Sequence, residues 1–304
     1  EYIDDIAIER DGKKYYRIPA VFDCWYESGM AGIAKEGKNC ANYSYPVDFI
    51  AESLDQTRGW FYTLNVLSTA LYNKPAFKQV IVSGLILASD GMKMSKRLNN
   101  YTPPDDILKQ YGADVLRLYL LSSPATQAQE FRFVDKELYI ITKKLLPYFH
   151  SHKMLGECLQ NIRIKYPQDY YDNLFNKEYQ SDDLLDTWVL NLTNKLHYNI
   201  NESIEKLELY KIPDIIFKFI DDLTNIWVKF SRERLKNYSS EKDAINSINT
   251  LFKVLTKTNV ILSAFMPFNS EFLYQYINFQ STRDIDQINS IHLLITDKEI
   301  SYDE

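Results

Sequence analysis

The first 125 residues alternate between short apolar runs and stretches with helical periodicity. The apolar runs at 48–52 and 79–84 have the length and composition of buried strands, and residues 56–73 between them predict a helix. A buried strand, a helix and a second buried strand in succession are typical of a parallel sheet. We therefore expect an α/β fold in this part of the chain.

A short helix is predicted at 102–112. Thr102 has the side chain of an N-cap, proline follows in the first turn, and Gly112 stands where a helix commonly ends. These three signals together set the expected boundaries of the helix.

Beyond about residue 135 the strand patterns give way to helical periodicity, which predicts amphipathic helices packed as a bundle. The polar stretch 166–183 predicts a long exposed loop, and a fresh capped helix is expected at 269–277, after Pro267. The apolar positions that recur at helical spacing are Leu185, Trp188, Val189, Leu192 and Leu196; Ile216, Phe219, Ile220, Leu223, Trp227 and Phe230; and Ile248, Leu251 and Leu255.

Composition is that of an ordinary globular protein, with 304 residues, 45% hydrophobic and 25% charged. These values exclude a disordered or fibrous chain and allow about two domains. The sequence has no apolar window of about 18 residues and no signal peptide at its start, so we expect no membrane association. A net charge of −6 does not favour nucleic-acid binding, but a local basic face is enough for phosphate recognition.

Three cysteines, Cys24, Cys40 and Cys158, lack C-x-x-C spacing. Their odd number and spacing argue against a disulfide framework and a zinc ribbon, and favour reduced intracellular thiols. No set of metal ligands is predicted.

A hairpin is predicted directly after the second strand. The apolar run 85–88 and the segment 92–94 flank Asp90 and Gly91, a dipeptide that favours a tight turn. The hairpin ends in the tetrapeptide Lys-Met-Ser-Lys, at 93–96. A lysine-rich turn is commonly only a solvated hairpin tip.

The alternative for this tetrapeptide is phosphate binding. Two ammonium groups three residues apart, with a hydroxyl between them, can close on a polyphosphate, and fixed cations stabilise the charge that builds on departing pyrophosphate. Gly91 would let the loop close after ATP has entered. The sequence contains no glycine-rich phosphate-binding motif, so binding would depend on the lysines.

Four blocks and one helical stretch carry a resemblance to a known family. The blocks are FDCWYESG (22–29), ESLDQTRGWFYTL (52–64), GMKMSKR (91–97) and YGADVLRLYLLSSP (111–124). They resemble successive blocks of the isoleucyl-tRNA synthetases, class I aminoacyl-tRNA synthetases, in their eukaryotic cytoplasmic form. FIDDLTNIWVKFSRERLK (219–236) is similar to the anticodon-binding helices of that family. Arg97 replaces a serine of many class I members, and arginine is frequent in the cytoplasmic isoleucyl branch.

The resemblance implies a fold and an activity. The fold would be α/β then all-α: the C-terminal half of a Rossmann-type catalytic domain with the lysine loop at 1–125, then a helical-bundle anticodon-binding domain at 126–304. The activity would be ATP-dependent formation of isoleucyl-adenylate and transfer of isoleucine to tRNA(Ile). ATP is then a substrate, Mg²⁺ is inferred, the partners are isoleucine and tRNA(Ile), and a cytoplasmic location is expected.

The resemblance also assigns catalytic roles by position. Lys96, with Lys93, would stabilise the transition state. Apart from the family, carboxylates such as Glu52 and Asp55 are more often helix caps, and tryptophans such as Trp25 and Trp60 are more often core residues. The implied ATP-binding residues are Lys93, Met94, Ser95 and Lys96. Those that would bind the aminoacyl-adenylate are Glu52, Asp55 and Gln56, with Trp25 and Trp60 as walls of the isoleucine pocket.

A basic run of Lys229, Arg232, Arg234 and Lys236 lies at a predicted helix end, with Glu233 opposing it. Such a run either compensates the helix dipole or contacts nucleic acid. The family favours tRNA contact.

One element of the family is absent from the sequence. None of the histidines, His150, His152, His197 and His292, begins a His-x-Gly-His motif. The chain is therefore expected to be a fragment that lacks this half-site and the editing domain, and to be inactive alone. The alternatives are a valyl- or leucyl-tRNA synthetase fragment, against which the block DQTRGWFYTL argues, and a non-catalytic tRNA-binding module.

Overall fold

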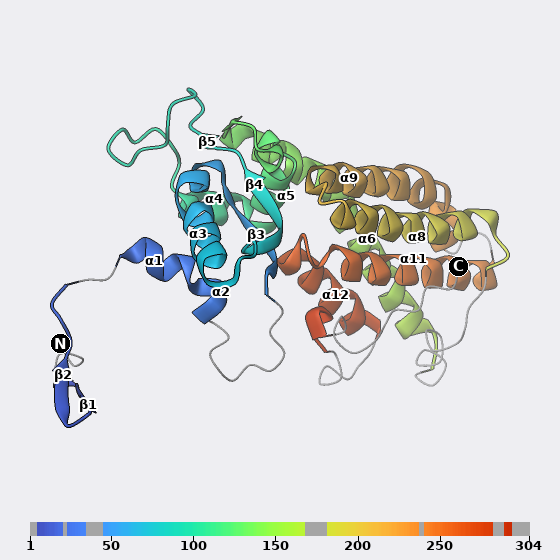
Figure 1. Cartoon of the computed structure of the whole chain (residues 1–304). Helices are drawn as coiled ribbons and strands as arrows, with labels where there is room; N and C mark the ends of the chain where they lie inside the picture. The colour runs from blue at the N-terminus through green and yellow to red at the C-terminus, as the bar shows by residue number, and fades with distance from the viewer. Residues whose placement is uncertain are drawn as a thin grey trace. The chain divides into compact units, whose positions relative to one another are not determined.

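The computed structural model describes residues 5–20, 23–34, 45–167, 181–236, 240–281 and 289–293 (Figure 1). The chain divides into two compact units, Glu1–Ser83 and Gly84–Glu304. Cys40 and most of the loop predicted at 166–183 lie outside the described residues.

The first unit is built on a two-stranded parallel sheet. β3 (Val47–Ser53) pairs in parallel with β4 (Phe77–Ser83), and α3 (Trp60–Tyr72) connects them, so the predicted order of strand, helix and strand is confirmed. The prediction that both strands are buried is wrong: Ile50 is the only buried residue of β3, and β4 has none, because two strands and one connecting helix bury little surface. Asn65 closes the connection, because its amide donates to Phe61 O and accepts from Ala76 N–H. The remaining elements are the hairpin β1 (Ala7–Arg10) and β2 (Lys13–Tyr16), α1 (Cys24–Gly29), α2 (Ala31–Ala34) and the 3₁₀ turn η2 (Leu54–Arg58).

The second unit opens with a small sheet. β5 (Ile86–Leu87) pairs in parallel with β6 (Phe131–Arg132), and Leu87 forms an antiparallel bridge with Lys93. Ala88 N–H donates to Met92 O at 2.9 Å, so the predicted hairpin is confirmed. Between β5 and β6 lie α4 (Pro104–Tyr111), α5 (Ala113–Leu121) and the 3₁₀ turn η3 (Pro124–Gln127).

The start of α4 differs from the prediction. Thr102 is not the N-cap: the cap position is Pro103, which is extended at φ −55° and ψ 138°, and the helix begins at Pro104. Two successive prolines delay the helix by one residue, since a residue before proline disfavours the helical region. The Thr102 hydroxyl instead donates to the Asp135 carboxylate. At the other end Gly112, at φ 81°, terminates α4 as predicted.

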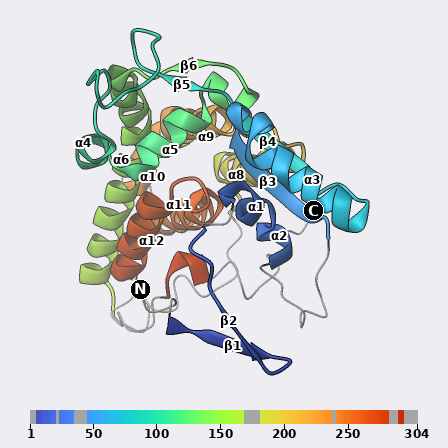
Figure 2. The ribbon, with the colours of Figure 1, turned by 60° about the vertical axis from the view of Figure 1, so that its left-hand side comes forward.

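The rest of the second unit is a helical bundle (Figure 2). Its core includes Trp227, Tyr148 and Leu155, all fully buried. Arg117 joins distant segments, because its guanidinium donates to the carbonyls of Ala264 and Phe265. The elements are α6 (Asp135–Lys165), α8 (Leu184–Glu205), the 3₁₀ turn η4 (Leu209–Lys211), α9 (Ile212–Asp222), the π-helical turn η5 (Leu223–Val228), α10 (Arg232–Leu235), α11 (Glu241–Leu262) and α12 (Pro267–Ser281).

Two predictions about the bundle are corrected. α12 begins at Pro267 and not two residues after it, because proline suits the first position of a helix. Phe230 does not continue the buried stripe of Trp227 and is 67% exposed. The π-helical turn adds a residue to the helical repeat, so the buried face continues at Ser231 and Leu235.

Candidate functional site

The lysine hairpin of the second unit is ordered by backbone and side-chain hydrogen bonds. Gly91 takes φ +82°, which favours glycine, and Met92 N–H donates to Asp90 Oδ1 at 2.8 Å. Lys93 pairs with Leu87 of β5, so the tetrapeptide starts at the last paired residue of the hairpin and continues beyond it. This pairing fixes the position of the Lys93 backbone.

Asn100 clamps the tetrapeptide from its far end. Its side-chain oxygen accepts from Ser95 N–H at 2.9 Å, and its amide donates to Lys93 O at 3.2 Å. Asn99 next to it takes the left-handed conformation at φ 48°. Sequence reasoning missed Asn100, although the Asn-Asn pair after the lysines is a recognised turn signal.

Lys93 and Lys96 are exposed, whereas Met94 and Ser95 are half-buried. No ion pair of the described residues involves either lysine. Met94 is one of the residues that line a cavity of about 950 Å³, whose other lining residues are both apolar, such as Ile107, and polar, such as Asn100. The hairpin thus presents two ammonium groups that form no ion pair among the described residues, on a loop held by the Asn100 side chain.

The residues implied for adenylate binding lie in the first unit, in α1 and around the carboxyl end of β3. Glu52 and Asp55 are exposed. Gln56 is half-buried: its Oε1 accepts from Trp60 N–H at 3.1 Å, and its Nε2 donates to Asp55 Oδ2 at 3.2 Å. Gln56 therefore caps the start of α3 and orients one of the two carboxylates, while Glu52 lies accessible at the strand end.

The two tryptophans meet at this same helix start. Trp60 Nε1 donates to Ser28 O at 2.9 Å, which ties α3 to α1. A Cβ on Gly59 would stand 3.3 Å from the Trp25 ring, so this ring packs closely on the glycine. Trp25 remains 46% exposed. The structure thus brings Trp25, Gln56 and Trp60 together around Gly59.

The basic run divides into two kinds of residue. Lys229, Arg232 and Lys236 are exposed, and Lys229 lies 5.9 Å from the centre of the Phe230 ring. Three exposed cations, one of them beside an exposed aromatic ring, suit a nucleic acid, which offers phosphates and stacked bases.

Arg234 differs, because an internal ion-pair cluster engages its guanidinium, which is only 13% exposed. It donates to both oxygens of the buried Asp186 at 2.9 and 2.8 Å, and to Asp243 at 2.8 Å. Burial lowers the Arg234 pKa, but hydrogen bonds to these carboxylates outweigh it and raise the pKa overall. Its role as a tRNA contact stays a prediction.

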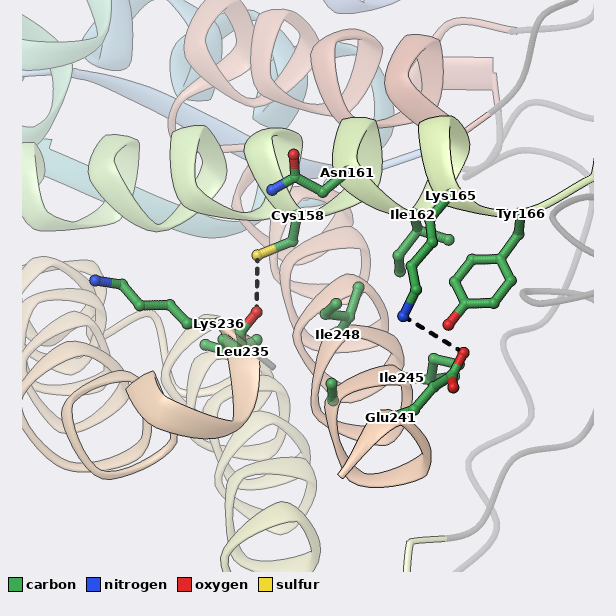
Figure 3. A pocket seen from close by; sticks show the side chains of 11 residues that line it. Cys158, Asn161, Ile162, Lys165, Tyr166, Leu235, Lys236, Glu241, Ile245 and Ile248 are labelled. Carbon is green, nitrogen blue, oxygen red and sulfur yellow. Dashed lines mark hydrogen bonds and ion pairs between the residues drawn. The ribbon is translucent and has the colours of Figure 1, made fainter. Parts of the chain in front are cut away.

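A small cavity of about 180 Å³ lies beside Lys236, between α6 and α11 (Figure 3). Lys165 pairs with Glu241 at 3.7 Å across its mouth. The Cys158 thiol donates to Leu235 O at 3.6 Å, and burial raises the pKa of this thiol to about 11. Cys158 is therefore a structural cysteine and not an activated nucleophile.

Clustered metal ligands and membrane spans are both missing from the described ranges. Within them no three or more His, Cys, Asp or Glu side chains gather to hold a metal ion. In the same part of the chain, no helix has the length and apolar character needed to cross a membrane.

Comparisons with known proteins match both halves of the chain. Residues 1–132 match the family of tRNA synthetases class I (I, L, M and V), and residues 186–302 match the anticodon-binding domain of tRNA ligase. The chain is 39% identical over 299 residues to an isoleucine–tRNA ligase of Protochlamydia amoebophila, covering 96% of this chain and 28% of the relative.

Two cytoplasmic isoleucine–tRNA ligases are similar to the same extent. That of Mus musculus is 40% identical over 97% of this chain and 24% of its own length, and that of Arabidopsis thaliana is 41% identical over 85% and 22%. The chain thus spans about a quarter of the length of these relatives.

Solved structures share the fold. LeuRS of Agrobacterium radiobacter K84, in a ternary complex with tRNA and LeuAMS, superposes with a TM-score of 0.64 at 15% identity, over 94% of this chain and 34% of that one. Mycobacterium tuberculosis methionyl-tRNA synthetase with methionyl-adenylate gives 0.61 at 17% identity, over 81% and 47%. The predicted fold class, a Rossmann-type part followed by a helical anticodon-binding part, is confirmed. The sequence relatives named above are isoleucine–tRNA ligases, as the sequence resemblance indicated. The chain therefore belongs to the class I tRNA synthetase family.

Proposed function

We propose that the chain is the part of an isoleucine–tRNA ligase that carries the phosphate-binding lysine loop and the tRNA-binding helices. The observation that carries the proposal is the hairpin: two exposed lysines, free of ion pairs among the described residues, on a loop clamped by Asn100. Unneutralised cations on an ordered loop are what a polyphosphate site needs, since no internal carboxylate has to be displaced first.

In this proposal the hairpin acts on the ATP phosphates. The isoleucine carboxylate attacks the α-phosphorus of ATP, and pyrophosphate leaves with its charge stabilised by Lys93 and Lys96. Half-buried Met94 lines the cavity beside the loop, and Ser95 adds a hydroxyl donor between the lysines. The described residues show no ligand set for Mg²⁺, so no step is assigned to a metal.

The first unit would hold the adenylate. Glu52, near the end of β3, and Asp55, just after it, are exposed acceptors at the carboxyl end of the strand, the position at which α/β sheets bind ligands. Gln56, Trp25 and Trp60 form one packed group around Gly59, and the partly exposed Trp25 ring offers an apolar wall for a branched side chain.

The proposal extends to partner, boundary and location. Lys229, Arg232 and Lys236 would contact the tRNA(Ile) backbone, with Arg234 holding their helix end through Asp186. The catalytic part would end near residue 125 and the anticodon-binding part would start at 126. A cytoplasmic location is supported by two relatives that are named cytoplasmic.

The test is ATP–pyrophosphate exchange by the full-length protein that carries this sequence, with isoleucine, valine or leucine. Exchange should be strongest with isoleucine, and Lys96→Ala should lower it by about 10² to 10³. Lys195→Ala, an exposed lysine on α8, is the matched control and should leave it unchanged. Stronger exchange with valine or leucine would show that isoleucine is not the substrate. Normal exchange by Lys96→Ala would refute the role of the loop.

A second candidate, a non-catalytic tRNA-binding module, is favoured by the three exposed cations alone. It predicts salt-dependent tRNA binding by this chain, together with no exchange by the full-length protein. Replacing one phosphate-binding cation by alanine should reduce the slope of log K against log salt by about one.

A further inference from the structure

Arg132 stands in register with the lysine hairpin. It is the second residue of β6 and pairs with Leu87 of β5, and Leu87 in turn bridges to Lys93. β5 is central, because Leu87 O accepts from Phe133 N–H on one side and Ala88 N–H donates to Met92 O on the other. Residues in one row of a sheet share a face, so Arg132 and Lys93 project on the same side, about 10 Å apart across two strand spacings.

The Arg132 side chain reaches the turn that precedes the lysines. A Cβ on Gly91 would stand 3.1 Å from Arg132 Cζ and Nε and 3.2 Å from its second terminal nitrogen. Three atoms of one planar group at nearly equal distance place the guanidinium flat against the glycine. Gly91 thus suits its φ of +82°, and a side chain there would also crowd the Arg132 guanidinium and displace it by a few tenths of an ångström.

The charge on Arg132 is not neutralised within the described residues, since no ion pair among them involves it. The nearest carboxylate along the hairpin, that of Asp90, accepts from Met92 N–H. The guanidinium therefore contributes a positive field to the loop that carries Lys93 and Lys96.

We propose that Arg132 is a positioning residue of the lysine loop: its guanidinium seats the Asp90–Gly91 turn and so fixes where Lys93 and Lys96 meet the polyphosphate. The claim that Lys93 and Lys96 meet a polyphosphate rests on the proposed function. The claim that Arg132 packs on the Asp90–Gly91 turn does not. Sequence separation hides this contact, because Gly91 and Arg132 lie 41 positions apart.

Hydrogen exchange on this chain tests the seating without any substrate. Arg132→Ala and Gly91→Ala should each speed amide exchange over residues 90–98 several-fold relative to α6, because each disrupts the same packing from one side. Lys109→Ala, an exposed lysine of α4, is the control and should leave the loop unchanged. Unchanged exchange over 90–98 in Arg132→Ala would overturn the proposal whether or not the chain is part of a synthetase.

Kinetics of the full-length protein separate positioning from general stability. Arg132→Ala should lower kcat of pyrophosphate exchange about tenfold and change KM for ATP less, and Arg132→Lys, which keeps the charge but not the flat group, should restore only part of kcat. If Lys96→Ala abolishes exchange while Arg132→Ala leaves kcat normal, the proposed function stands and the role of Arg132 fails. If Lys96→Ala has no effect, the proposed function fails, and the hydrogen exchange result alone decides the seating.

Discussion

The first unit and the helical bundle differ in how their side chains are used. The sheet unit has a small core of Ile50, Phe61, Leu64 and Ala76, and it leaves large apolar groups such as Phe49 half exposed. The bundle buries a continuous cluster that runs from α4 to α12. The sheet unit is therefore thinly packed, whereas the bundle has a large core of its own.

Polar groups show the same difference. In the bundle, buried Asp186 is satisfied by Arg234, Trp227 and Ser181. On the hairpin, the described structure gives Lys93 and Lys96 no ion pair. A satisfied buried network makes the fold rigid and is costly to break, whereas an exposed cation without an ion pair is available to a ligand.

Core truncations should give the largest effects and should differ between the units. Leu155→Ala in the bundle removes a fully buried side chain from a rigid site and should cost about 5 kcal/mol of unfolding free energy, while Leu64→Ala in the small core should cost about 2 kcal/mol. Urea denaturation followed at both units measures this. Equal losses would show that the two cores pack alike.

Breaking the ion-pair cluster should cost nearly as much. Arg234→Ala leaves Asp186 buried without its partner, so about 3 to 5 kcal/mol should be lost in the same denaturation experiment. Lys229→Ala, in an exposed position of the same basic run, should change stability by less than about 0.5 kcal/mol. A small effect of Arg234→Ala would mean that the cluster is not structural.

Acid should weaken the bundle through His152. Its ring is fully buried, contacts Tyr148 O at 2.9 Å and Asn259 Nδ2 at 3.0 Å, and burial lowers its pKa to about 4. The unfolded chain, with an ordinary histidine pKa near 6.5, binds the proton first. Stability should therefore be fully present above about pH 6.5 and fall toward pH 4, by about 3 kcal/mol in all.

The control for this pH dependence is His152→Gln, measured by thermal unfolding between pH 4 and 7. The variant should be less stable at pH 7, but its stability should fall less steeply between pH 6.5 and pH 4 than that of the unchanged protein. A slope that persists in the variant would assign the acid sensitivity to other groups.

The helix cap across the bundle should give the smallest effect. Asp114 Oδ2 accepts from Asn269 N–H at 2.6 Å, in the first turn of α12, and its other oxygen has no partner in the described structure. Asp114→Asn keeps the shape but removes the charge from the helix start, so about 1 kcal/mol should be lost. Thermal unfolding would detect it; a gain in stability would mean that burial of the charge outweighs the cap.

Strands and turns that are set by neighbouring residues could be predicted from local patterns in the sequence. The strands at 48–52 and 79–84 and the turn at Asp90 and Gly91 are confirmed, because short apolar runs and turn chemistry act over a few residues. The helix start assigned to Thr102 is wrong, since consecutive prolines outweigh a capping side chain.

Contacts between distant residues could not be predicted from the sequence. Phe230 leaves the buried stripe because of a π-helical turn that periodicity does not reveal. Arg234 looked like its exposed basic neighbours, but its partner Asp186 is 48 residues away. The seat of Arg132 on Gly91 is equally non-local. The roles of Lys93, Lys96 and the adenylate-binding residues stay predictions, since the structure shows their placement and not a bound ligand.

The central claim is that the lysine hairpin carries the activation chemistry and the bundle contacts tRNA. Its most direct test is isoleucine-dependent pyrophosphate exchange by two variants of the full-length protein. Lys96→Ala on the hairpin should lose about 10² to 10³ in exchange, whereas the triple variant Lys229→Ala, Arg232→Ala, Lys236→Ala should keep it within about twofold, because activation needs the polyphosphate site and not tRNA. Equal losses in both, or no loss in Lys96→Ala, would contradict the assignment of chemistry to the hairpin and of tRNA contact to the bundle.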